Sequence, residues 1–322
     1  MRWFLLSLLC AACAPTFAST GPAQPRALVH GFQPTGPIEI SGTLPANRVL
    51  RTMQRYAVPA WSDLLATHVA HTMQDEGEAA VSVVRKPRQS GFEAARVVAA
   101  APPDGQTLLL ATREPPASPG FELQPVALVA TMPYVLVLRT GGAVNDAREL
   151  IEQARRGSER VPVATMSAQT IGYSALDLLR RQVPALQPVA YNGGHAALQA
   201  IVGNQVVAGL IPLPSVMPYL GGGRIKVVAV ADTQRHDGIP DVPTTADAGM
   251  SGLVAAGWFG VFAPSATASS TVRRLDALLA RGPRSEQTVQ FFSELGLRLE
   301  HRDPGQFAKR LAEDPRLLSK PL

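Results

Sequence analysis

The chain has 322 residues, of which 46% are hydrophobic, and carries a formal net charge of +5. A chain of this length can bury a substantial core and suits two domains better than one. The positive charge is spread along the sequence, which argues against a nucleic-acid-binding protein, because such proteins usually gather basic residues on one face. A diffuse positive charge weakly favours anionic solutes.

The N-terminus has the pattern of an export signal. Arg2 supplies a short positive region, residues 3–14 are mostly apolar, and small side chains precede a cleavage point after Ala18. The apolar stretch is too short to anchor the chain across a bilayer. We therefore expect a signal peptide over 1–18, a mature chain that begins near Ser19, and a periplasmic location.

Both cysteines, Cys10 and Cys13, lie inside this signal. Lipid attachment at Cys13 would favour a branched apolar residue three positions earlier, where this chain has Cys10, so we do not expect a lipoprotein. Cleavage after Ala18 leaves a mature chain without cysteine, and therefore without disulfide or thiol chemistry.

The rest of the chain is predicted to alternate strands and helices. Residues 19–47 are rich in Pro, Gly, Thr and Ser, which predicts a leader without regular structure. The spacing of apolar residues then predicts helices over 61–73, 92–101, 146–156, 173–181, 195–202, 271–280 and 288–295. Strands are predicted over 80–84, 107–111, 126–138 with an interruption at Pro133, 161–165, 206–211, 226–231 and 258–263. Such alternation is typical of α/β layers with mostly parallel sheets.

Five motifs along the chain form a further pattern. They are APPDGQTLL at 101–109, QPVALVA at 124–130, PVAYNG at 188–193, IPDVPT at 239–244 and GWFGVFAP at 257–264. In this order and spacing they resemble the Bug family, the solute-binding receptors of tripartite tricarboxylate transporters. The resemblance runs from about Val58 to about Ala312.

The resemblance implies an α/β fold of the type II periplasmic-binding-protein class, in which two α/β domains are joined by crossing segments around a ligand cleft. We expect domain 1 to comprise 48–130 and 257–322, and domain 2 to comprise 131–256, after the leader over 19–47. In parallel α/β sheets the ligand crevice lies at the carboxyl ends of strands, where helix N-termini suit an anion. The family is one of receptors, so we expect no enzymatic activity, no cofactor and no metal.

The first expected ligand loop, 58–63, departs from the family pattern. It keeps the terminal Ser62 and Asp63, but the bulky Trp61 stands where the family has glycines. Because glycines let a backbone approach a ligand closely, the usual carboxylate cradle is not expected here. An ordinary helix N-cap is the alternative role for Ser62 and Asp63.

The second expected ligand loop, 165–173, precedes the helix that contacts the ligand from domain 2. Its candidate ligand residues are Ser167, Ala168, Gln169 and Thr170. Ser167 and Thr170 keep hydroxyl groups that can donate to an anion, and a plain capping role is the alternative.

Three further candidates complete the expected site. The loop after the strand 107–111 supplies Thr112 and Arg113. A guanidinium at Arg113 fits a bidentate clamp on a carboxylate, whereas a surface ion pair is the alternative. Tyr191 either lines the cleft or packs in the core.

The expected function is capture of a small organic carboxylate, either a di- or tricarboxylate, an acidic amino acid or an aromatic acid. A monomeric receptor would deliver it to membrane transporter subunits. The alternative is a family member that has lost transport-grade binding and acts as a sensor or accessory protein, in contact with a sensor-kinase ectodomain. The lost loop glycines favour this alternative.

Two other patterns suggest different chemistry. Gly172, Ser174 and Leu176 half-match the G-x-S-x-G nucleophile elbow of hydrolases, but leucine stands in place of the final glycine. His68 and His71 lie three residues apart on a predicted helix, without a third metal ligand at matching spacing. We expect exposed histidines rather than a metal site.

Overall fold

The computed structural model describes residues 26–30, 61–77, 81–85, 92–112, 120–157, 159–166, 170–250, 252–282 and 285–313. Its strands are β1 (Arg26–His30), β2 (Val81–Arg85), β3 (Thr107–Ala111), β4 (Leu123–Arg139), β5 (Val161–Thr165), β6 (Leu186–Ala190), β7 (Ala208–Pro212), β8 (Ile225–Val230), β9 (Ala256–Pro264) and β10 (Arg298–Arg302). Its helices are α2 (Trp61–Gly77), α3 (Phe92–Ala99), α4 (Ala147–Arg156), α5 (Ile171–Arg180), α6 (Gly194–Val202), α7 (Leu213–Val216), the 3-10 helix η2 (Met217–Gly222), α8 (Ser269–Leu279), α9 (Glu286–Glu294) and α10 (Pro304–Glu313). The predicted mixture of strands and helices is confirmed, with shifts at the element ends.

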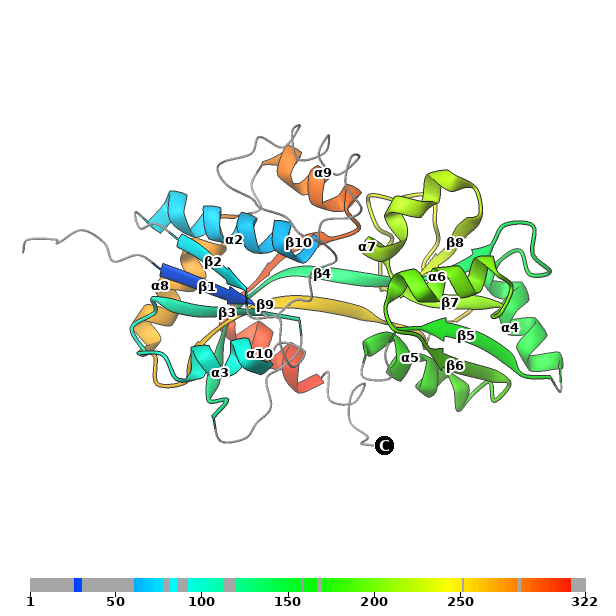
Figure 1. The fold of residues 1–322 in the computed structure, drawn as a ribbon, viewed down its shortest axis with the longest axis horizontal. Helices are drawn as coiled ribbons and strands as arrows, with labels where there is room; N and C mark the ends of the chain where they lie inside the picture. Colours follow the sequence, from blue (N-terminus) through cyan, green and yellow to red (C-terminus); the bar gives the residue numbers. More distant parts are fainter. Residues whose placement is uncertain are drawn as a thin grey trace, which may run out of the picture.

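The strands form one curled sheet that extends through two lobes (Figure 1). The strand order is β2-β1-β3-β9-β4-β7-β5-β6, and β8 and β10 also pair with β4. In the first lobe β1, β2 and β3 run parallel, and in the second lobe β5, β6 and β7 run parallel. The long β4 passes through both lobes. The expected domain boundaries at 130/131 and 256/257 stay a prediction.

Pro133 does not interrupt β4, contrary to the prediction from sequence. Up to Pro133 the strand pairs with β9, and from Tyr134 onward it pairs with β7 and β8. A proline cannot donate a ladder hydrogen bond, and here it stands where the strand exchanges one set of partners for another. The strand therefore continues through it.

β1 lies inside the segment that we expected to be irregular, and this expectation is wrong for residues 26–30. The strand lies between β2 and β3, and its Leu28 and Val29 are 0% and 2% exposed. Only three apolar residues in succession mark it in the sequence, which is too short a run for periodicity to detect. Its stability comes from the neighbouring strands on both sides.

Alternating side chains of the first-lobe strands contact different helices. Leu28, Leu108 and Leu110 belong to the cluster that includes α2 and α8, whereas Val29 and Leu109 pack with α3 and α10. Figure 1 shows α2 and α3 on opposite faces of these strands. In the second lobe, α4 and α5 share one cluster and α6 and α7 another. Both lobes thus have the helix–sheet–helix layering of α/β proteins.

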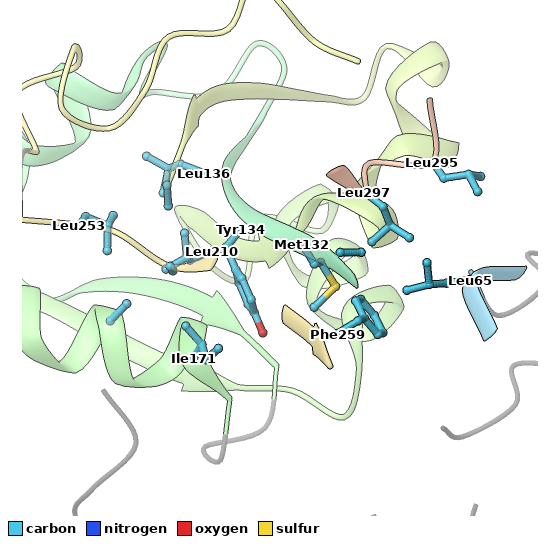
Figure 2. Packing of buried hydrophobic residues seen from close by; sticks show 14 of the residues in the cluster. Leu65, Met132, Tyr134, Leu136, Ile171, Leu210, Leu253, Phe259, Leu295 and Leu297 are labelled. Carbon is cyan, nitrogen blue, oxygen red and sulfur yellow. The ribbon is translucent and has the colours of Figure 1, made fainter. Parts of the chain in front are cut away.

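One cluster of buried side chains continues from the first lobe into the second (Figure 2). It runs from Leu65 of α2 through Phe259 of β9 and Met132 and Tyr134 of β4 to Leu210 of β7. We call this the shared core. The two lobes are therefore packed together at the crossing strands.

A second contact joins the segment after β8 to the start of β10. Nη1 of Arg298 lies 3.0 Å from Oδ2 of Asp232, and Nη2 donates to the backbone oxygen of Arg235 at 2.8 Å. Beside this pair the buried ring of His236 hydrogen-bonds to the backbone of Leu297. The contact ties an element of the second lobe to one of the first.

We expect Arg298→Ala to lower the free energy of unfolding by about 1–2 kcal/mol, because it leaves the carboxylate of Asp232, whose side chain is 12% exposed, without its cation. Urea unfolding followed by circular dichroism measures the change. As a matched control, Arg156→Ala removes a side chain that is 79% exposed and paired with Glu152, and should cost less than about 0.5 kcal/mol. Equal losses in the two variants would contradict the prediction.

Candidate functional site

Two loops of the second lobe meet at the carboxyl ends of parallel strands. β5 ends at Thr165 and β6 at Ala190, and these two residues are partners in the sheet. Immediately beyond them, the N–H of Tyr191 donates to the oxygen of Thr165 at 2.9 Å. α5 begins at Ile171 and α6 at Gly194, so both helices start from this edge. Helix N-termini at such an edge favour an anion.

The start of α5 is contacted by Tyr134, which sequence reasoning did not identify as a site residue. Tyr134 is 4% exposed, and its phenol oxygen accepts the backbone N–H of Gly172 and shares a hydrogen bond with the hydroxyl of Thr170. Burial raises the pKa of Tyr134 to about 12, although these two hydrogen bonds oppose the rise. The phenol is therefore protonated at neutral pH. Figure 2 shows its oxygen directed toward α5.

The ring of Tyr134 fits against α5 because residue 172 has no side chain. A Cβ at Gly172 would lie 2.5 Å from Cε1 of the ring and 3.1 Å from Oγ1 of Thr165. Glycine has a low helix propensity, so its presence in the first turn of α5 needs another reason. It was the one local sign in the sequence that another group packs closely against the helix at this position. Nothing in the sequence indicates which residue makes that approach.

The first-lobe candidates lie at the start of α2 and after β3. Ser62 and Asp63 are both buried and lie within the first turn of α2, which begins at Trp61. The carboxylate of Asp63 is placed where the helix dipole favours negative charge. Thr112 directly follows β3 and is half-buried. Their roles in ligand binding stay predictions.

The remaining candidates divide into those within and those outside the described part of the chain. Thr170 precedes α5 and Tyr191 follows β6, where Tyr191 packs against the cluster of α6 and α7. The side chain of Trp61 and the residues Arg113, Ser167, Ala168 and Gln169 lie outside the described residues. The structure thus brings Thr170 and Tyr191 to one edge of the second-lobe sheet.

The two alternative chemistries find no matching geometry. Ser174 lies inside α5, with its N–H donating to the oxygen of Thr170 at 3.2 Å, whereas a nucleophile elbow needs its serine on a strand-to-helix turn. Within the described ranges, no group of three His, Cys, Asp or Glu residues is placed to hold a metal ion. The expectation of exposed histidines is wrong for His68, which is half-buried with its ring 5.0 Å from that of Phe292, because α9 packs beside α2 there.

A family model described as the tripartite tricarboxylate transporter family receptor matches residues 65–320. The chain belongs to this family. Protein BugT of Bordetella pertussis is 25% identical to this family member over 296 residues, which cover 88% of this chain and 83% of the relative. A UPF0065 protein from the tcbD-tcbE intergenic region of Pseudomonas sp. strain P51 is 28% identical over 249 residues, covering 73% and 74%.

Solved structures of receptors agree with the assignment of this chain to the family. MatC from Rhodopseudomonas palustris with bound malate has a TM-score of 0.65 at 25% identity, covering 91% of this chain and 97% of that one. A TctC solute binding protein from Polaromonas has a TM-score of 0.69 at 18% identity, covering 92% and 96%. The resemblance to the Bug family and the predicted type II periplasmic-binding-protein fold are both confirmed. Across the described residues, the receptor has no helix with the length and apolar character needed to span a bilayer.

Proposed function

We propose that this receptor captures a small organic carboxylate in the periplasm, between its two lobes, and delivers it to the membrane subunits of a tripartite tricarboxylate transporter. The observation that carries the proposal is the meeting of the α5 and α6 starts at one sheet edge, held by the bond from Tyr191 to Thr165. Donors at such an edge stabilise a carboxylate without a cationic side chain. MatC, which shares the fold, holds malate.

The first lobe supplies the opposite wall on this proposal. Among its described candidates, Ser62 and Thr112 carry hydroxyl groups that can donate to the solute, and Arg113 is the proposed cation. Trp61 would cover an apolar part of the solute. A ligand that contacts both lobes favours the closed arrangement by its higher affinity for that arrangement, which is how a monomeric receptor closes on its cargo.

A thermal-shift screen of the mature protein tests the proposal. The probes are malate, adipate, acidic amino acids and aromatic acids at millimolar concentration, each beside its uncharged amide. A ligand at 100 times its Kd stabilises the folded state by about 2.7 kcal/mol, so even a weak ligand raises the melting temperature. We expect at least one carboxylate, and none of the amides, to raise it.

Thr170→Phe tests where the solute binds. The phenyl group places bulk at the sheet edge beside the start of α5, so we expect the affinity for that carboxylate to fall at least about tenfold, equivalent to 1.4 kcal/mol. Thr140→Phe, at an exposed turn after β4, is the matched control and should keep wild-type affinity. Unchanged affinity in Thr170→Phe would place the site elsewhere. If no carboxylate binds the wild type, the sensor or accessory role becomes the better account.

A further inference from the structure

We propose that His236 is a pH-sensitive switch in the contact between the two lobes. While its ring is neutral it holds the lobes together at that contact, and when the ring binds a proton the contact weakens. Separation of domains is the movement by which a hinged receptor opens, so falling pH favours the more open arrangement of this receptor. The switch needs no solute and goes beyond the proposed function.

The contact joins the turn after α9 to the segment that follows β8. The turn, residues 293–298, leads into β10, and β10 pairs with β4 ahead of Pro133, which places the turn in the first lobe. The segment, residues 232–240, belongs to the second lobe, because Ile239 packs against the cluster of α6 and α7. We call these two stretches together the interlobe contact. It connects the lobes in addition to the crossing strands β4 and β9.

Two glycines let the backbones of the lobes touch within the interlobe contact. A Cβ at Gly238 would overlap the backbone oxygen of Ser293. A Cβ at Gly296, which has a φ of +81°, would lie 2.8 Å from the backbone nitrogen of Pro214 in α7. Because no flexible side chain lies between these backbones, a displacement of residue 238 changes the distance between the lobes directly.

The ring of His236 connects both stretches through its two nitrogens. Nδ1 accepts the N–H of Gly238 at 3.1 Å. A neutral imidazole has one donor nitrogen, so Nε2 carries the proton and donates to the backbone oxygen of Leu297. The ring is 1% exposed, so solvent does not compete for either hydrogen bond. Only the neutral ring satisfies both partners.

Protonation of His236 removes the first of these hydrogen bonds. The added proton goes to Nδ1, which then directs a donor toward the N–H of Gly238. Two donors that face each other repel. Because Gly238 is also in contact with Ser293, the repulsion is relieved when the two stretches move apart.

The environment of the ring sets the direction of the pH effect. Burial and then the charge of Arg298 lower the pKa of His236, although Asp237 and Asp232 of its own segment oppose this. Asp232 is itself paired with Arg298, at 3.0 Å between Oδ2 and Nη1. When the stretches move apart, the ring loses both causes of the lowered pKa and binds a proton more readily. Acid therefore favours separation.

The distance between the lobes at several pH values tests this proposal without any solute. The chain after Ala18 contains no cysteine, so Gln287→Cys on α9 and Gln199→Cys on α6 introduce two exposed attachment points for spin labels. Electron–electron double resonance then measures the distribution of distances between the labels. Between about pH 7.5 and about pH 5 we expect the fraction of longer distances to rise several-fold.

His236→Asn removes the titration and keeps an acceptor at this position. A side-chain oxygen at position 236 accepts the N–H two residues on, as in an Asx turn, and asparagine binds no proton in this pH range. We expect the distances in this variant not to change with pH. His68→Gln is the matched control and should keep the wild-type response, because it removes another histidine with a lowered pKa whose ring contacts Phe292 of α9.

The ring resonances of His236, followed by nuclear magnetic resonance, give a second test in the receptor with its histidine in place. The change in distance should follow the titration of this ring, with a midpoint below pH 6.5. Distances that do not depend on pH, a response that persists in His236→Asn, or one that follows a different titration would overturn the switch. None of these results depends on carboxylate binding, so a failure of the proposed function is recognised separately.

Discussion

Replacing Phe307 with alanine is expected to lower the free energy of unfolding by about 3–5 kcal/mol, the range for deleting a large buried aromatic side chain. Phe307 is 0% exposed, and its ring centroid lies 5.1 Å from that of Trp258 and 5.3 Å from that of Phe262. The ring also fills the space above Gly260, where any Cβ would overlap it. Phe307 thus packs α10 against the crossing strand β9.

Chemical unfolding followed by circular dichroism measures this loss. Phe307→Leu keeps most of the buried volume and should lose clearly less than Phe307→Ala. Val97→Ala is the surface control, since Val97 is 41% exposed, and it should stay within about 0.5 kcal/mol of the wild type. A loss below about 1 kcal/mol for Phe307→Ala would mean that the aromatic cluster closes the cavity or was never tightly packed.

The second large effect is acid destabilisation through His68. Its pKa is lowered from 6.5 to about 4, first by burial and then by the charge of His71. Between these two pH values the unfolded chain binds a proton that the folded chain does not. Stability is therefore full above pH 6.5 and is lost as the pH falls toward about 4, by about 3 kcal/mol in all. The lowered pKa of His236, caused first by burial and then by Arg298, acts in the same direction.

His68→Gln separates this contribution from general acid denaturation. Urea midpoints measured between pH 6.5 and 4 should fall less steeply in the variant, because the residue no longer titrates. Thr72→Val on the same helix changes no titratable group and serves as the control with the wild-type slope. A His68→Gln slope equal to that of the wild type would rule out the assigned cause.

Most of the fold followed from local patterns, and the exceptions have physical reasons. Periodicity predicted the strands and helices that carry several buried residues each. β6 was not predicted because Pro188 lies inside it, yet β6 is an edge strand, where a proline is tolerated. α10 was not predicted because only Phe307 and Leu311 are buried in it.

The candidate site was predictable only where a motif marked it. Thr170 and Tyr191 were found from the family resemblance, and the structure places both at the carboxyl edge of the second-lobe strands. Tyr134 was not found, because its contact with Gly172 joins two elements far apart in the sequence. No local pattern in β4 distinguishes a tyrosine that caps a helix from one that fills a core.

The shared core determines whether the two lobes of this receptor can exist as separate pieces. Because Met132, Tyr134 and Phe259 pack with residues of both lobes, cutting the chain into separate lobes would expose these side chains to water. Each lobe keeps a smaller cluster of its own, but the shared core needs side chains from both lobes. Heat should therefore melt the whole receptor in one cooperative step rather than lobe by lobe. The two lobes would then be gained or lost together in evolution, although β4 pairs with different strands in each lobe.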